Sequence, residues 1–309
     1  MKARSSKCGA VRLWLCGIML ALAVALLVTA VCGASDKGGN QGNPGVFPPQ
    51  SHPDGRSFCG ASNKGGHQGN PGVFPPQSHP YGRSYGEWGA AWQQWVFTTT
   101  TENCPVTDNT GARALVNQSG HVYFLAGTFG ELPDTPWAAP NPVTRNVTIP
   151  TGIALCIPIS NWGLCYPEDL PDVPPEDAVA TMYEWLNAYY DPMPEADLEC
   201  EVDGAAVKNL LNYRAQSDPF EIYVPADNVE NDLMRYFTGD PNFSYAEGWH
   251  LSISDGFYVM LAPLSAGKHT IHLRCGPADS PFLDVYYNLT VRGGKEAKKE
   301  DKCNDRPKK

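Results

Sequence analysis

The sequence predicts a mainly β protein: an antiparallel β-sandwich with two short peripheral helices. Two observations support this fold class. Short segments after residue 120 alternate apolar and polar side chains with a period of two, and glycine and proline turns separate them. Helical patterns are confined to residues 84–97 and 176–190.

The first helix is predicted from its start signal and its apolar spacing. Ser84 and Glu87 have the spacing of a capping box, in which each side chain satisfies the other's free backbone N–H. Trp88, Trp92 and Trp95 follow at i, i+4 and i+7, so they share one helical face. We expect this stripe of indoles to pack against a sheet. The alternative is a carbohydrate-stacking platform, which makes the three tryptophans the candidate binding residues.

The strand segments follow the first helix in order. A turn at 150–152 divides the second segment, and the stretch PLSAG joins two strands in the fifth. In the last segment, residues 285, 287, 289 and 291 are apolar and share one face. The segments are GHVYFLAGTFG, PVTRNVTIPTGIALCIPISN, DLECEVDG, DPFEIYVP, DGFYVMLAPLSAGKHTIHLRC and FLDVYYNLTV.

An acidic, proline-rich stretch precedes the second helix and suggests two roles. Its carboxylates could hold calcium, but the strict spacing of an EF-hand loop is absent. We therefore favour the other role, in which acidic residues before a helix complement its dipole. The carboxylates are Glu168, Asp169, Asp172, Glu176 and Asp177.

Residues 1–34 read as an export segment. Four basic residues precede residues 13–32, which are free of charge and mostly apolar. The segment predicts a cleaved signal peptide, a membrane anchor through residues 13–32, or lipidation of Cys32, and cleavage is favoured. Each alternative predicts that the rest of the chain is secreted or held at the cell surface.

A tandem repeat follows the export segment. Residues 32–58 and 59–85 differ at only four positions, and both copies are rich in glycine, proline and polar residues. Such a composition buries too little apolar surface to offset the entropy of ordering. We predict a disordered tether over 35–83, with a proline-rich ligand motif in GVFPPQ as the alternative. The sandwich domain is then 84–292, and 293–309 is a disordered charged tail.

The bulk composition limits the partners. The net charge of −10 argues against nucleic acid, because phosphate binding needs a basic face. Ten cysteines suggest an oxidising compartment and disulfides. Cys200 and Cys275 are each in phase with inward apolar residues, so we predict a bridge between them. In the alternative, Cys275 pairs with Cys303.

The other cysteines divide into two groups. Cys165 is expected to pair with Cys104 or Cys156. Cys59 is a copy of Cys32 within the repeat, so Cys59 and Cys303 are placed outside the core.

The order of motifs also carries a resemblance. SYGEWGAAWQQW, GHVYFLAGTFG, VTIPTGIALCIPISN, SDGFYVMLAPLSAGKHTIHL and YNLTV follow one another over residues 84–291. This order resembles an uncharacterised family of exported, mostly bacterial β-rich proteins. The resemblance implies one extracytoplasmic domain and supplies no catalytic residues.

The sequence offers no recognisable catalytic group, metal site or cofactor motif. There is no G-x-S-x-G elbow, H-E-x-x-H or C-x-x-C pairing. His269 and His272 fall on opposite faces of one predicted strand, and we expect His269 to be partly buried and hydrogen-bonded. His121 and His250 carry no assigned role. We therefore predict a non-catalytic protein that binds a glycan, polymer or protein, with an extracellular hydrolase using loop carboxylates as the alternative.

Overall fold

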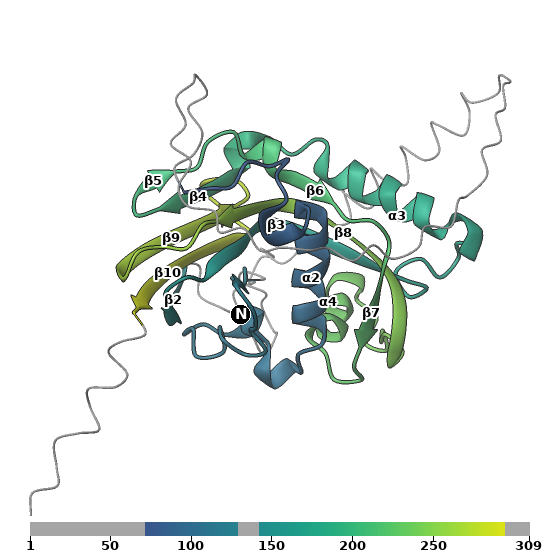
Figure 1. Ribbon diagram of the computed structural model, residues 1–309. Helices are drawn as coiled ribbons and strands as arrows, with labels where there is room; N and C mark the ends of the chain where they lie inside the picture. Colours follow the sequence, from purple (N-terminus) through teal and green to yellow (C-terminus); the bar gives the residue numbers. More distant parts are fainter. Residues whose placement is uncertain (1–71, 129–141, 294–309) are drawn as a thin grey trace, which may run out of the picture. The chain divides into compact units, whose positions relative to one another are not determined.

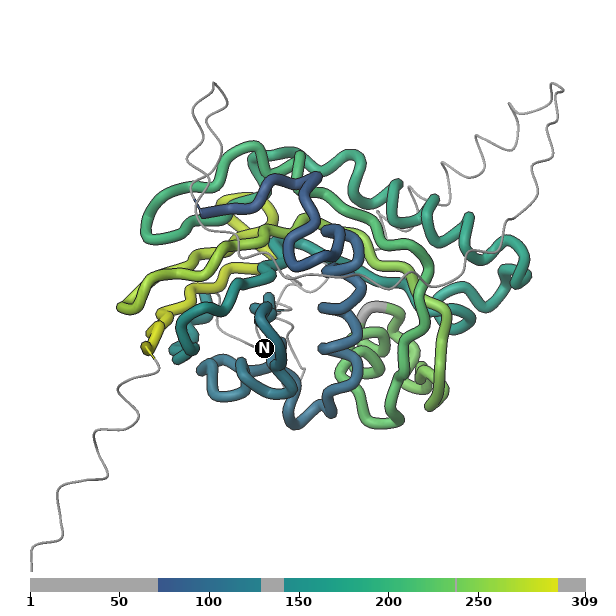
Figure 2. The backbone as a smooth tube through the Cα atoms, in the orientation of Figure 1, coloured from purple at the N-terminus to yellow at the C-terminus, as the bar shows by residue number. Residues whose placement is uncertain are grey.

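The computed structural model describes residues 72–128 and 142–293 (Figures 1 and 2). The predicted export segment, most of the tether and all but the first residue of the charged tail lie outside these ranges. The helices are α2 (Tyr85–Phe97), α3 (Pro175–Tyr190) and α4 (Val229–Thr238). The strands are β1 (Val122–Phe124), β2 (Val143–Pro150), β3 (Ala154–Tyr166), β4 (Leu198–Val202), β5 (Ala205–Ala206), β6 (Arg214–Gln216), β7 (Phe220–Val224), β8 (Gly248–Leu261), β9 (Gly267–Cys275) and β10 (Leu283–Arg292).

The strands form two sheets, so the sandwich-like, β-rich part of the prediction is confirmed. Sheet A has the order β1-β3-β8-β6, with β7 also paired to β8, and sheet B has the order β2-β10-β9-β4-β5. The sheets are mixed, because β1 pairs with β3 and β10 pairs with β2 in parallel. The two strands joined by PLSAG do not form a hairpin: β8 enters sheet A and β9 enters sheet B.

One hydrophobic core joins the two sheets, and helices cover both faces of β8. The core takes side chains from both sheets and from α2 and α3. On α2, Gly89 lies against the Tyr258 ring. On α3, the Tyr190 ring packs against the Phe257 ring, with ring centroids 5.7 Å apart. Adjacent strand residues point to opposite faces. Helices α2 and α3 therefore lie on opposite sides of sheet A.

The start of α2 and its contact with sheet A agree with the sequence prediction. The Ser84 N–H donates to Glu87 Oε2 at 2.6 Å, and the Glu87 N–H donates to Ser84 Oγ at 3.2 Å, which completes the capping box. Gly86 lies so close to the backbone of Gln216 that a Cβ at this position would overlap the carbonyl group. The small residues on this face of α2 therefore allow the helix to approach the sheet closely.

The folded part begins earlier than the predicted Ser84. Val73 forms a bridge to Leu261, and the Phe74 N–H donates to the Met260 carbonyl at 2.9 Å. The Tyr85 hydroxyl donates to the Phe74 carbonyl at 2.7 Å. Residues 72–83 were assigned to the tether because of their composition, but they pack on the domain through backbone hydrogen bonds that composition does not reveal.

The predicted disulfide between Cys200 and Cys275 is not formed. Both side chains point inward and are buried, as expected, but both thiols are free. The register places Cys200 opposite Leu273 and Cys275 opposite Leu198, so the two cysteines are diagonal neighbours on β4 and β9. Diagonal pairs have Cα atoms about 7–8 Å apart, beyond the usual reach of a disulfide.

The alternative pair of Cys275 with Cys303 lies outside the described residues, because Cys303 is not among them. The pairs predicted for Cys165 are not formed. Cys104, Cys156 and Cys165 are buried and also free, so Cys165 pairs with neither of its predicted partners.

Among the described helices, none combines the length and apolar character needed to cross a bilayer.

Candidate functional site

The three tryptophans predicted as candidate binding residues do not form a binding surface. Trp88, Trp92 and Trp95 are all buried, as the expected packing against the sheet requires. Their indole N–H groups donate to the backbone carbonyls of Pro80, Leu125 and Val116 at 2.7–2.9 Å. A sugar ring needs an open aromatic face, and these indoles are covered. The stacking interpretation of this stripe is therefore corrected.

A different tryptophan is exposed to solvent. Trp249 lies at the start of β8 and is 69% exposed, the highest value among the large apolar side chains described. Its register partner is Tyr223 on β7, and the two rings meet edge to face with centroids 5.6 Å apart. We call these two residues the aromatic pair. Because both residues belong to paired strands, the backbone places the two side chains directly opposite each other.

A carboxylate lies beside the aromatic pair. The Tyr223 hydroxyl donates to Glu247 Oε1 at 3.0 Å, and this hydrogen bond to a carboxylate raises the pKa of Tyr223. Glu247 is exposed, so its second oxygen faces water. The surface thus combines an exposed indole, a phenol held by a hydrogen bond and a carboxylate that can accept hydrogen bonds.

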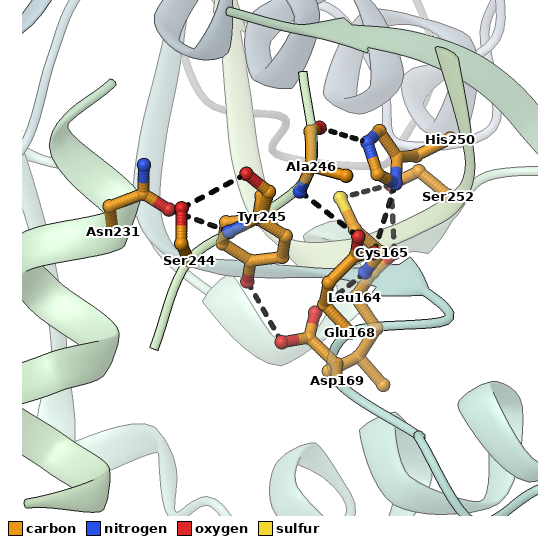
Figure 3. A network of polar contacts seen from close by, with 10 residues as sticks. All are labelled: Leu164, Cys165, Glu168, Asp169, Asn231, Ser244, Tyr245, Ala246, His250 and Ser252. Atoms are coloured by element: carbon orange, nitrogen blue, oxygen red, sulfur yellow. Dashed lines mark hydrogen bonds and ion pairs between the residues drawn. The ribbon is translucent and has the colours of Figure 1, made fainter. Parts of the chain in front are cut away.

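Glu168 and His250, which lie against each other, both hold the loop that carries Glu247 (Figure 3). Glu168 Oε1 accepts from the Ala246 N–H at 3.1 Å, and His250 Nε2 donates to the Ala246 carbonyl at 2.7 Å. The remaining atoms, Glu168 Oε2 and His250 Nδ1, lie 3.0 Å apart. These two atoms are within ion-pair distance, but they make no hydrogen bond to each other. The backbone of Ala246 is therefore held from both sides.

A second carboxylate holds the preceding residue of the same loop. Asp169 Oδ1 accepts from the Tyr245 hydroxyl at 2.8 Å, and Asp169 Oδ2 accepts from the Cys165 N–H at 2.7 Å. The Tyr245 N–H donates to Asn231 Oδ1 on α4 at 2.8 Å. We call Glu168, Asp169, Tyr245 and His250 the buried polar network. It joins the end of β3, the loop before β8 and α4.

Burial shifts the acidity of the carboxyls at this network. Desolvation is the main cause that raises the pKa of Asp169 to about 6, against two hydrogen bonds that lower it. Glu230, at the start of α4, has its pKa raised to about 8 by desolvation and by the charge of Asp169. Glu168 and Asp169 were expected to complement the dipole of α3. Instead they bind the loop before β8, while Glu176 and Asp177 occupy the first turn of α3.

The other histidines are placed largely as predicted. His269 is partly buried and lies 2.7 Å from Asp203 through Nδ1, which raises the pKa of His269. Its Nε2 donates to the Ser265 carbonyl at 3.0 Å. His272 lies on the opposite face of β9 beside acidic residues. His121 is exposed.

The site was missed because its parts are far apart in the sequence. Glu168, Tyr223 and Trp249 come from three segments that meet only through the pairing of β3, β7 and β8. A partial signal was present, since Trp249 lies in β8 and most of the other apolar residues of that strand are buried. No residue near Trp249 in the sequence indicates that this part of the strand is left uncovered.

Comparisons with protein-family models, curated proteins and solved structures found no match to this chain. The assignment of a function therefore depends on the geometry described above.

Proposed function

We propose that the chain is an exported, non-catalytic β-rich protein that binds a glycan through the aromatic pair. The observation that carries this proposal is the exposure of the Trp249 indole on a rigid strand. The C–H bonds on one face of a sugar ring pack well on an aromatic ring, and tryptophan and tyrosine are enriched in binding surfaces. Glu247 supplies an acceptor for a sugar hydroxyl. The apolar segment 13–32 and the resemblance to exported proteins support the location.

The test is binding of the full chain to an array of glycans and polysaccharides. Trp249→Ala should weaken binding at least tenfold, about 1.4 kcal/mol, because the stacking surface is removed. Its melting temperature should stay close to that of the wild type, since exposed side chains contribute little to stability. Phe282→Ala, which removes another exposed ring, is the matched control and should bind normally.

Trp92→Ala provides the contrast in stability. It removes a buried indole and should cost about 3–5 kcal/mol of unfolding free energy.

Equal glycan binding by the wild type and Trp249→Ala, or no glycan bound by the wild type, would contradict the proposal.

A second candidate function has one observation in its favour. Asp169 and Glu230 are neighbouring carboxyls with raised pKa values, a pattern seen at acid–base sites. A hydrolase would release reducing sugars or acids from the same panel, and Asp169→Asn and Glu230→Gln would abolish the release. We favour binding because the oxygens of Asp169 are both engaged by Tyr245 and Cys165.

A further inference from the structure

A histidine and three carboxylates converge on the outer face of sheet B, away from the aromatic pair on sheet A. Glu199 and Glu201 lie on β4, His272 on β9 and Asp284 on β10. One ligand atom from each of Glu199, Glu201 and His272 lies within 4.8 Å of the others. The register explains this convergence, because Glu201 is directly opposite His272. Side chains two apart on β4 then reach the same ring.

Asp284 sets the tautomer of His272. His272 Nε2 lies 2.8 Å from Asp284 Oδ1, and an ionised carboxylate can only accept, so Nε2 carries a proton. When the ring is neutral, its lone pair is on Nδ1, the atom that lies 3.3 Å from Glu199 Oε1. A carboxylate behind the ring N–H and a free nitrogen in front is the arrangement found in histidine metal ligands.

Two other side chains fix the ligands in place. The Tyr286 ring stacks on His272 with centroids 4.0 Å apart and an angle of 4° between the planes. Arg274 Nε donates to Glu199 Oε2 at 2.8 Å, which leaves Oε1 directed at His272. The orientation of the imidazole and of one carboxylate is therefore set before any ion binds.

We propose that His272, Glu199 and Glu201 form a zinc site on this face. Zinc bonds of about 2.0–2.1 Å to nitrogen and oxygen in tetrahedral geometry place neighbouring ligand atoms about 3.3–3.4 Å apart. The observed 3.3 Å between Nδ1 and Oε1 matches this separation. Imidazole favours zinc over calcium or magnesium. Three carboxylates and one arginine leave a local charge that balances a divalent cation, and the fourth position stays open to water or another ligand.

The test is titration of the full chain, without a polyhistidine tag, with ZnCl₂ in a calorimeter. We expect one site that His272→Ala abolishes and that Glu201→Gln weakens. Asp284→Asn removes the carboxylate behind the ring and should weaken zinc about 10–100-fold without removing a ligand. All three changes lie on the outer face of sheet B, and circular dichroism checks that each variant is folded.

His269→Ala is the matched control, because it removes a second histidine–aspartate pair from the same strand but from the other face. It should bind zinc as the wild type does. The proposal is overturned if the wild type binds no zinc, or if His272→Ala binds zinc with unchanged affinity. Equal loss in His269→Ala would also overturn it, since the site would then not be specific to this face.

Discussion

Four tryptophans and one arginine show how far the burial of a single residue can be predicted from its neighbours in the sequence. The spacing of Trp88, Trp92 and Trp95 predicts burial, and all three are buried. Trp249 is in phase with Ile253 on β8, and Ile253 is fully buried. Trp249 is nevertheless exposed, since the residues that cover Ile253 do not extend over the first residues of β8. A strand pattern gives the face of a residue but not the extent of the layer above it.

Arg145 shows the same limit for a charged residue that is buried. It is in phase with Val147 on β2, so alternation places it in the core, where it is 1% exposed. Its guanidinium donates to the carbonyls of Val106, Asp108, Ala126 and Gly127 and to the Tyr287 hydroxyl. The sequence could predict an inward arginine, but the carbonyl groups that satisfy it come from loops whose path was not predictable.

The cysteines give a prediction at this scale. Burial raises the pKa of Cys104 and Cys275 to about 11 and that of Cys200 to about 12, so these thiols stay protonated and covered at neutral pH. Since the thiolate is the reactive form, N-ethylmaleimide should label none of the three in the native protein and all three in urea. Peptide mapping by mass spectrometry measures the labelling. A linked peptide joining LECEVDG to HLRCGP in unreduced protein would contradict this prediction.

At the scale of elements, α4 was missed although its ends carry ordinary signals. Asn228 caps the helix by accepting from the Asn231 N–H at 3.0 Å, and Gly239 ends it in the left-handed conformation. An asparagine before and a glycine after a polar stretch predict these boundaries. The contacts of α4 with the buried polar network, through Asn231 and Glu230, were not predictable, because they depend on the loop before β8.

The buried polar network and Glu230 predict a pH dependence of stability. Asp169 and Glu230 have pKa values of about 6 and 8 in the folded state, above the 3.8 and 4.5 of the free groups. The folded state therefore holds protons that the unfolded state has released between about pH 4 and 8. The contribution of these two groups to the unfolding free energy should be largest at about pH 4 and below, and it should fall as the pH rises through 6 and 8. Cys165 and Tyr245 stay neutral in this range, because burial raises the pKa of both further.

Glu230→Gln should remove the upper part of this decline. The variant should be more stable than the wild type at pH 9 by about 2–3 kcal/mol, less than the full shift implies, because the side chain is partly exposed. Glu176→Gln, an exposed change in α3, is the control and should keep the wild-type profile. Urea denaturation between pH 4 and 9 measures the effect. A profile of Glu230→Gln identical to that of the wild type would show that Glu230 ionises without cost.

At the scale of the whole molecule, the strands were predicted better than their pairing. The phases of β4 and β10 follow from alternation, and their inward residues are buried except Val202, which is half-buried. The parallel pairs β1–β3 and β2–β10 were not predicted, because a local pattern carries no information on which strand lies beside it. The same gap explains the error at Cys200 and Cys275: both were correctly placed inside, and a register offset of two residues keeps them apart.

We expect the stable domain to begin near Gly72. The Gly72 carbonyl accepts from the Ala262 N–H at 2.8 Å, and the Phe74 N–H donates to Met260 at 2.9 Å. The Pro80 carbonyl accepts from the Trp88 indole at 2.9 Å. Limited proteolysis of the full chain should therefore leave a core whose first residue lies near 72 and not near 84.

Truncated variants measure what the segment contributes. A variant that begins at Ser84 loses the three hydrogen bonds above, each worth about 1 kcal/mol, together with the packing of Val73 and Phe74. It should lose about 3 kcal/mol or more of unfolding free energy relative to a variant that begins at Gly69. Equal stability of the two variants in urea would mean that residues 72–83 lie on the domain without stabilising it, and the boundary predicted at Ser84 would stand.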